Sequence, residues 1–286
     1  MFGDAAVGSA YSAGTETLKR AGIVSAAAEM RTLLSELTGI PPLEIPLSRR
    51  QLTSDEAAYL KDLLDRRAGH EPLQYLLGKA YFYDLELEVA PAVLIPRPET
   101  ELLVEWVLRE LPPGGELLDL GTGSGAVAVA VARHRPDAKI AAADLSPEAL
   151  AIAERNAGKN GVSAIRFVRS DLFFAFSGAA FDLIAANLPY VPERDRDGLD
   201  PEVRDHEPAL ALFAGADGFD LLERAGKEVA GFLRPGGKAI FELDPRQAGR
   251  MSALLAASGF ACEVLRDLSG RERFVAGTLP CAPKRR

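Results

Sequence analysis

Apolar and polar positions follow a helical pattern in the first part of the chain. Apolar residues recur at intervals of three and four between Leu18 and Leu37, which is typical of a helix that buries one face. Gly39 and the pair Pro41-Pro42 end this run, because neither residue type continues a helix. The pattern therefore predicts one helical run that stops at Gly39.

Two further helices are predicted before residue 79. Ser54 precedes DEAAYLKDLLDRR, so its hydroxyl can cap the free amides of a second helix, and Gly69 ends that helix. A short third helix, EPLQYLL, has Pro72 in its first turn and ends at Gly78. Residues 1–78 are thus expected to form a small helical domain.

The period changes to two after Ala80. Phe82, Leu85, Leu87 and Val89 are apolar residues in surroundings that favour strands. This pattern predicts a β-hairpin linker at residues 79–98, between the helical domain and a second domain at residues 99–286.

Strands and helices alternate in the second domain. The segments that resemble strands are ELLDL, KIAAAD, AIRFV, FDLIAAN and KAIFEL, at residues 116–120, 139–144, 164–168, 181–187 and 238–243. Such alternation predicts an α/β fold with a doubly wound parallel sheet. The last two apolar runs, at residues 260–267 and 271–279, are separated by a turn sequence and predict a terminal antiparallel hairpin.

Composition and charge exclude several classes of protein. Lys and Arg number 33 and Asp and Glu 41, for a formal charge of −8, so we expect no duplex nucleic acid as a partner. Two cysteines and three scattered histidines predict neither a disulfide scaffold nor a metal site. The N-terminus lacks the pattern of a signal peptide, and no apolar run is long enough to span a membrane. A cytoplasmic protein is therefore expected.

A glycine-rich loop joins the first strand of the second domain to the helix after it. Gly121, Gly123 and Gly125 alternate there, which allows a sharp turn and a close approach of a ligand to the main chain. The loop also fits a relaxed dinucleotide pattern. S-adenosylmethionine is favoured over NAD because Asp119 can face an ammonium group but would repel a pyrophosphate. Asp144, at the end of the next strand, can bind ribose hydroxyls with either cofactor.

A second motif, Asn187-Leu188-Pro189-Tyr190, follows the strand at 181–187. It falls at the carboxyl edge, where open α/β sheets bind ligands. The Asn187 side-chain oxygen and a main-chain carbonyl of Leu188 or Pro189 can accept the two hydrogens of a planar amino group. Pro189 fixes the local backbone, and Tyr190 offers a ring face to a planar group.

These motifs resemble those of class I methyltransferases that alkylate planar amino groups. Over nearly the whole chain, the sequence further resembles bacterial peptide-chain release factor glutamine methyltransferases. The segments that carry this likeness include EPLQYLLGKAYFYDLELEVAPAVLIPRPETELLVE, LLDLGTGSGAVAVAVA, SDLF, NLPYVP and EVRDHEPALALFAGADGFDLL. The resemblance implies methyl transfer from S-adenosylmethionine to the side-chain amide of the glutamine in the Gly-Gly-Gln loop of release factors.

The resemblance also implies roles for individual residues. The methionine part of the cofactor would be held by Gly121, Thr122, Gly123, Ser124 and Gly125, and the ribose by Asp144. Asp171 and Leu172 would flank the adenine. Asn187 to Tyr190 would hold the glutamine amide, and Asn187 would also lie beside the cofactor. Arg97 to Glu101 would lie beside the mouth of the pocket.

The sequence departs from the family at Leu188, where the usual motif has a proline. N-L-P-Y is typical of ribosomal RNA adenine dimethyltransferases, so an adenine amino methyltransferase acting on nucleic acid is the alternative. The loop after the motif, PERDRDGLDPEVRDHEP, carries many acids, which disfavours this alternative. Asp119 and the absence of an evident acid for hydride transfer argue against a nicotinamide oxidoreductase. A non-catalytic binding module would leave Asn187, Pro189 and Tyr190 without a role.

Overall fold

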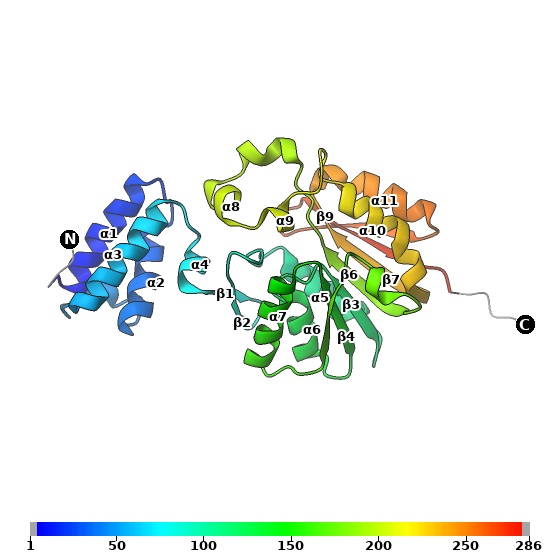
Figure 1. Cartoon of the computed structure of the whole chain (residues 1–286), viewed down its shortest axis with the longest axis horizontal. Helices are drawn as coiled ribbons and strands as arrows, with labels where there is room; N and C mark the ends of the chain where they lie inside the picture. The colour runs from blue at the N-terminus through cyan, green and yellow to red at the C-terminus, as the bar shows by residue number, and fades with distance from the viewer. Residues whose placement is uncertain (1–4, 282–286) are drawn as a thin grey trace, which may run out of the picture. The chain divides into compact units, whose positions relative to one another are not determined.

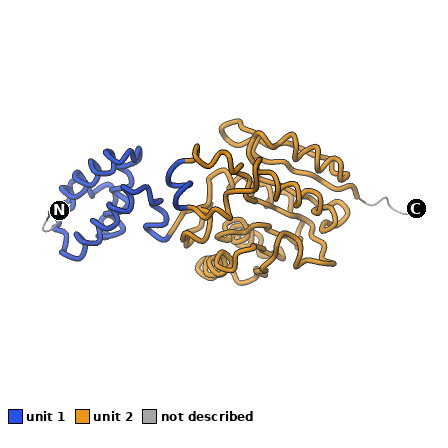
Figure 2. Tube along the Cα trace, turned by 45° about the horizontal axis from the view of Figure 1, so that its top comes forward, with its two compact units in different colours: residues 1–78, 200–206 blue, residues 79–199, 207–286 orange. Residues whose placement is uncertain are grey.

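The computed structural model describes residues 5–281, and these divide into two compact units. Of the described residues, 5–78 and 200–206 form the first unit, and 79–199 and 207–281 form the second (Figure 2). The first unit also takes up residues 200–206, and the predicted division into a helical domain, a linker and a second domain stays a prediction. The proposed linker at 79–98 belongs to the second unit.

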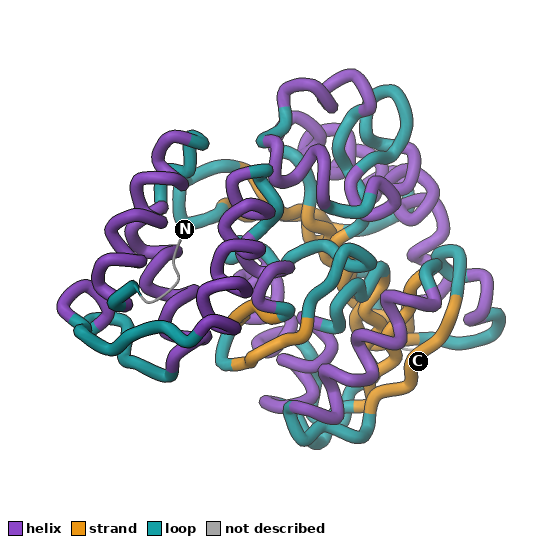
Figure 3. The backbone as a smooth tube through the Cα atoms, turned by 60° about the vertical axis from the view of Figure 1, so that its left-hand side comes forward, coloured by secondary structure: helices purple, strands orange, loops and turns teal. Residues whose placement is uncertain are grey.

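Helices make up most of the first unit (Figure 3). They enclose one apolar core that includes Leu18, Met30, Leu34 and Leu60. Its elements are α1 (Val7–Arg20), α2 (Ala26–Thr38), a 3₁₀ turn (Ile45–Leu47), α3 (Ser54–Ala68), α4 (Leu73–Leu77) and α8 (Pro201–His206).

The first helical run is two helices, and the prediction of an unbroken run to Gly39 was wrong. The Gly22 amide donates to the Lys19 carbonyl and the Ile23 amide to the Leu18 carbonyl, which closes the end of α1. Gly22 adopts a φ of 85° there, a conformation that glycine reaches without strain. The apolar spacing continues across the turn because both helices face the same core.

The cap of α3 is Thr53 and not Ser54. The Thr53 hydroxyl accepts from the Glu56 amide at 3.2 Å, and the Glu56 carboxylate accepts from the Thr53 amide at 2.9 Å. This reciprocal pair is a capping box, which satisfies two otherwise free amides. Ser54 is therefore the first residue of the helix.

The second unit contains a seven-stranded sheet in the order β5-β4-β3-β6-β7-β9-β8 (Figure 1). The first five strands in this order are parallel, whereas β9 is antiparallel to β7 and β8. The strands are β3 (Glu116–Leu120), β4 (Lys139–Asp144), β5 (Ile165–Arg169), β6 (Phe181–Asn187), β7 (Leu233–Glu242), β8 (Ala261–Arg266) and β9 (Glu272–Thr278). A separate antiparallel hairpin consists of β1 (Lys79–Phe82) and β2 (Leu85–Glu88).

Helices cover both faces of this sheet, with one apolar cluster on each face. Leu117 and Leu118, neighbours on β3, belong to different clusters, as alternation along a strand requires. One cluster includes side chains of α5 (Thr100–Glu110), α6 (Ala126–His134) and α7 (Pro147–Lys159). The other includes side chains of α10 (Asp220–Glu228) and α11 (Ala248–Ala257). The short α9 (Ala209–Leu212) and four 3₁₀ turns (Phe174–Phe176, Glu193–Gly198, Val229–Phe232, Pro245–Gln247) complete the unit.

The predicted fold class is confirmed: a doubly wound α/β sheet with a terminal antiparallel hairpin, preceded by a helical domain. β7 differs most from its predicted bounds, because it begins at Leu233 and not at residue 238. Its pairing with β6 shifts register between Phe181 and Leu183. The Pro235-Gly236-Gly237 sequence in this irregular stretch hides the strand from the apolar pattern. Within residues 5–281, no helix has the length and apolar character needed to cross a membrane.

Candidate functional site

The glycine-rich loop connects β3 to α6 and is held in a conformation that favours glycine. Gly121, Gly123 and Gly125 have φ values of 76°, 54° and 82°, where a side chain would be strained. A Cβ atom on Gly121 would lie 2.9 Å from Leu188 Cδ2. The loop therefore packs directly against the segment that follows β6.

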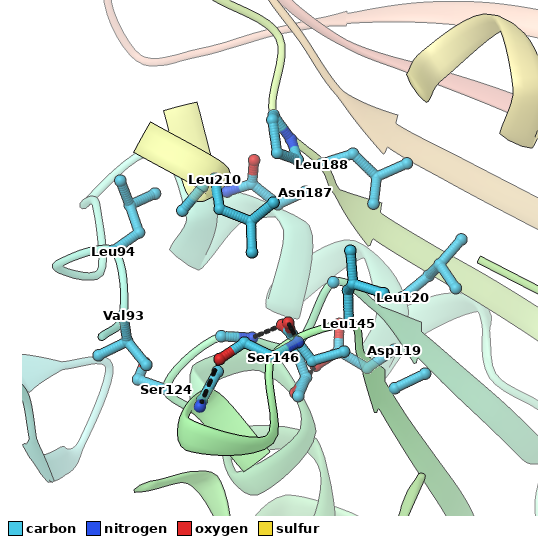
Figure 4. Close-up of a pocket in the computed structure, with 18 of the residues that line it drawn as sticks. Val93, Leu94, Asp119, Leu120, Ser124, Leu145, Ser146, Asn187, Leu188 and Leu210 are labelled. Atoms are coloured by element: carbon cyan, nitrogen blue, oxygen red, sulfur yellow. Dashed lines mark hydrogen bonds between the residues drawn. The ribbon is translucent and has the colours of Figure 1, made fainter. Parts of the chain in front are cut away.

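A cavity of about 370 Å³ lies beside this loop at the carboxyl ends of β3, β4 and β6. Its size falls within the roughly 300–1,000 Å³ of small-molecule sites. In Figure 4, Asn187, Leu188 and Leu210 lie on one side of the pocket, opposite Asp119, Ser124 and Ser146. The predicted cofactor residues that line it are Asp119, Gly121, Thr122, Gly123, Ser124, Asp144, Asp171, Leu172 and Asn187.

Two predicted site residues do not line the cavity. Gly125 instead begins α6, and a Cβ there would lie 3.0 Å from that of Ala153, so close helix packing accounts for this glycine. Tyr190 packs against the apolar cluster of α10 and α11, and burial raises the pKa of its phenol to about 12. A ring face for the substrate remains a prediction.

Asp119 is buried at the base of the cavity, with 2% exposure. Its Oδ2 accepts hydrogen bonds from the Thr122 hydroxyl at 2.6 Å and from the Ala128 amide at 3.2 Å. Burial raises the pKa of Asp119 to about 6, because it outweighs these two bonds, which act in the opposite direction. The carboxylate therefore braces the start of α6 as well as lining the cavity.

Asp144 ends β4 and holds the opposite side of the glycine loop. Its Oδ2 accepts from the Gly123 amide and its Oδ1 from the Ser146 amide, each at 2.9 Å. Burial raises its pKa, although bonds from backbone amides oppose the shift. Each carboxylate oxygen can accept more than one bond, so both remain able to bind a pair of hydroxyl groups.

Asn187 lies at the cavity wall, at the end of β6. Its Nδ2 donates to the Thr100 hydroxyl at 3.2 Å, and that hydroxyl donates to Glu242 Oε2 at 2.8 Å. The side-chain oxygen of Asn187 has no hydrogen-bond donor in the described part of the chain. Burial raises the pKa of Glu242 to about 7, against the opposing bond from Thr100.

The rest of the motif is held from outside the cavity. Leu188 is buried, with its side chain against Gly121, and both Leu188 and Pro189 line the cavity. The carbonyl of Tyr190 accepts from Gln247 Nε2 at 3.0 Å, and the same amide binds the Gly218 carbonyl at 3.0 Å. Gln247 thus fixes the backbone that leaves the motif.

Charged residues at the rim form ion pairs. Arg97 lines the cavity and binds the buried Glu207 through Nη2 at 2.6 Å. Asp171 is exposed and pairs with Arg224 of α10 at 3.0 Å. Glu101 lies outside the cavity lining, where its carboxylate accepts from the Tyr83 amide at 2.8 Å. Leu172 lies beside Asp171 with a φ of 46°, and the Ser170 hydroxyl donates to its carbonyl at 2.6 Å.

Sequence patterns did not reveal how three residues support the site, although one of them, Thr100, lies in the segment 97–101 that the resemblance placed beside the mouth of the pocket. Thr100 and Glu242 bind each other from α5 and β7, elements far apart in the chain. Asn156 of α7 is fully buried, and its Nδ2 donates to the Ser124 carbonyl at 2.8 Å and to the Glu88 carbonyl at 3.0 Å. An amide inside an otherwise apolar helix face was the one available signal for Asn156.

Two family models match the chain. The model of the PrmC N-terminal domain matches residues 9–78, and that of the methyltransferase small domain matches residues 98–199. A methyltransferase from Pyrococcus furiosus of known structure has a TM-score of 0.53 and 19% identity, over 69% of this chain and 90% of that one. This structural likeness supports the fold.

Curated relatives are similar over most of their length. A release factor glutamine methyltransferase from Deinococcus radiodurans is 42% identical over 264 residues, which cover 91% of this chain and 94% of the relative. A protein of the same name from Geobacter sulfurreducens is 38% identical, over 92% and 93%. With this identity over more than nine-tenths of its length, the chain is a methyltransferase that belongs to the release factor glutamine methyltransferase family.

Proposed function

We propose that this protein transfers a methyl group from S-adenosylmethionine to the side-chain amide nitrogen of a glutamine. The substrate is the glutamine in the Gly-Gly-Gln loop of class 1 peptide chain release factors. The observation that carries the proposal is the position of Asn187, whose carboxamide lies at the cavity wall beside the glycine loop with its oxygen unpaired. The names of the curated relatives support the choice of substrate.

The cavity fits S-adenosylmethionine in its residue types. The glycine loop gives close access to main-chain groups, and Asp144 offers two acceptor oxygens for ribose hydroxyls. Asp171 and the buried Leu172 give a polar and an apolar contact for an adenine. When bound, this cofactor supplies a methyl group on a positively charged sulfur.

The residues of the motif supply orientation. The lone pair of an amide nitrogen is delocalised, so the nitrogen is a weak nucleophile. Asn187 Oδ1 and a main-chain carbonyl of Leu188 or Pro189 would accept its two hydrogens and aim its lone pair at the methyl donor. Apolar side chains at the cavity, among them Leu94, Leu188 and Leu210, would limit the access of water to a bound substrate. The nitrogen gains the methyl group and loses one of its two protons to solvent during or after the transfer, so no strong base is required.

The alternative substrate is an exocyclic amine of adenine in nucleic acid, which the N-L-P-Y form of the motif favours. The charges near the site oppose it. Arg196 pairs with Glu193 at 2.9 Å, and Arg194 contacts Asp195 at 3.7 Å, so acids offset the cations of this loop. The net charge of −8 is a further argument against a nucleic-acid substrate, because phosphate binding relies on unpaired cations.

The test is a transfer assay with S-adenosylmethionine labelled in the methyl group. A purified class 1 release factor is compared with a version whose loop glutamine is alanine, and an adenine-containing RNA is added as a competing substrate. We expect label on the unaltered factor alone. Label on the RNA, or equal label on both versions of the factor, contradicts the proposal. Calorimetry with S-adenosylmethionine tests the cofactor separately.

A further inference from the structure

A chain of three side chains leads from the cavity into the protein interior. Asn187 ends β6, Thr100 begins α5, and Glu242 ends β7 beside Asn187 in the parallel register. Asn187 Nδ2 lies 3.2 Å from Thr100 Oγ1, which lies 2.8 Å from Glu242 Oε2. Thr100 is 5% exposed and Glu242 1% exposed. Of these three side chains, those of Asn187 and Thr100 line the cavity and that of Glu242 does not.

The hydrogen-bond donors and acceptors of these three side chains fix the direction in which the hydrogen bonds between them run. An ionised carboxylate only accepts hydrogen bonds, so Thr100 must give its single hydroxyl proton to Glu242. The hydroxyl oxygen can then only accept, and the part of Asn187 that faces it must be the NH₂ group. Asn187 Oδ1 is consequently left for another partner.

We propose that Thr100 and Glu242 are positioning residues that hold the Asn187 carboxamide with its oxygen toward the substrate amide. This inference rests on the proposed function. By this inference, Thr100 and Glu242 select a substrate that carries an NH₂ group, although neither residue needs to contact the substrate. A substrate group that presents an acceptor to Asn187 Oδ1 would be rejected, because two acceptors would face each other.

The burial of Glu242 supports this role. No Lys or Arg nitrogen among residues 5–281 forms an ion pair with Glu242, and a buried carboxylate without such a partner is costly. The charged and titratable groups that influence it are Arg97, Glu99, Tyr190 and Arg273. Burial is the largest influence and raises the pKa of Glu242 to about 7.

Protonation of Glu242 permits the hydrogen bonds between Glu242, Thr100 and Asn187 to run in the opposite direction. A carboxylic acid can donate to Thr100 Oγ1, which then donates to Asn187 Oδ1. The Asn187 NH₂ group would face the substrate NH₂, and two donors would meet. We therefore expect turnover to fall as the pH decreases through about 7, the pKa of Glu242.

The experiment compares Thr100→Val, Thr100→Ser and Glu242→Gln in the full-length enzyme. Valine matches the shape of threonine but has no hydroxyl, whereas serine keeps it. Thr32→Val is the matched control, since Thr32 binds only the Ala28 carbonyl within α2. The measurements are kcat and KM for the release factor across about pH 5.5 to 8.5, and S-adenosylmethionine affinity by calorimetry.

We expect Thr100→Val to lower kcat about tenfold, with cofactor affinity retained and Thr100→Ser within about twofold of wild type. In Glu242→Gln the decline of kcat below about pH 7 should disappear, because no titrating group remains in the chain of hydrogen bonds.

Three results would overturn the inference: full activity in Thr100→Val, equal losses in the valine and serine variants, or an unchanged pH profile in Glu242→Gln. Failure of the wild-type enzyme to label the release factor is a different result, because it removes the proposed function on which the inference rests.

Discussion

The two units bury carboxylates in different ways. In the helical unit, Glu29 binds Arg67 Nε at 2.6 Å, and Arg67 is 2% exposed. Arg67 also binds Glu202 and the Glu71 carbonyl. Burial alone would raise the pKa of Glu29, but hydrogen bonds from Arg67 and Ser25 outweigh it and hold the pKa below its ordinary value.

Two buried carboxylates of the second unit lack such compensation: Asp119, which lines the cavity, and Glu242, which lies behind it. They differ in this from Glu207, which pairs with Arg97. Asp119 accepts from the Thr122 hydroxyl and the Ala128 amide, and Glu242 from the Thr100 hydroxyl. No cation forms an ion pair with either carboxylate within residues 5–281. Burial dominates both, so the pKa of Asp119 rises to about 6 and that of Glu242 to about 7.

This difference separates a structural from a functional use of buried charge. A fully paired carboxylate stabilises the contact between helices and is ionised over a wide pH range. An unpaired one lowers stability, and such groups gather where a site needs an acceptor in a fixed place. The contrast predicts that substitutions in the first unit change folding, while those at the cavity change chemistry.

The largest expected effect is the loss of Arg67. Arg67→Met leaves Glu29 buried without its partner, and this should lower the free energy of unfolding by about 3–5 kcal/mol. Chemical denaturation followed by circular dichroism measures the change. The neighbouring Arg66 pairs with Glu71 at the surface, so Arg66→Met should cost no more than about 1 kcal/mol.

A double variant sharpens this result. Replacing both Glu29 and Arg67 with methionine removes the two buried charges together, which should restore most of the stability lost in Arg67→Met. If the double variant is as unstable as the single one, the pair is not the source of the effect.

Next in size is the effect of Asn187→Ala on turnover. Removal of a group that orients the reacting nitrogen should lower kcat about 100- to 1,000-fold, by analogy with the removal of other preorganised hydrogen-bonding groups. Unfolding and S-adenosylmethionine affinity should change little, because Asn187 is only partly buried. Asn160→Ala is the control, since Asn160 lies outside the cavity lining. Unchanged turnover would remove Asn187 from its proposed role.

The sequence was sufficient for the features that depend on local patterns. Strands β3, β4 and β6 have the predicted bounds because each is mostly apolar and buried along most of its length. The glycine loop and Asn187 could be located because each directly follows such a strand. The topology then brings their side chains to one edge of the sheet.

Contacts between residues that are far apart in the sequence could not be predicted in the same way. Thr100 and Glu242 meet only because α5 and β7 are neighbours in the fold, and no sequence spacing encodes that contact. Residues 200–206 join the helical unit through contacts such as the pair of Arg67 and Glu202. The choice of Thr53 over Ser54 as a cap depended on which hydroxyl reaches Glu56.

The smallest expected effect is on stability, and it depends on pH. The pKa of Glu242 rises from 4.5 to about 7 on folding, so between these values the folded state binds more protons than the unfolded state. Stability from this group is therefore present below about pH 4.5 and is lost as the pH rises through about 7.

Glutamine carries no charge to bury, so Glu242→Gln should be more stable than wild type at about pH 8. Because the pKa rises from 4.5 to about 7, the gain has an upper limit on the order of 3 kcal/mol. It should vanish near about pH 4.5. Glu86, whose pKa is lowered by its bond to Lys159, is the control of opposite sign, since Glu86→Gln should give no gain at about pH 8. Equal pH dependence in Glu242→Gln and wild type would mean that Glu242 is already compensated, and the contrast between the two units would fail at this residue.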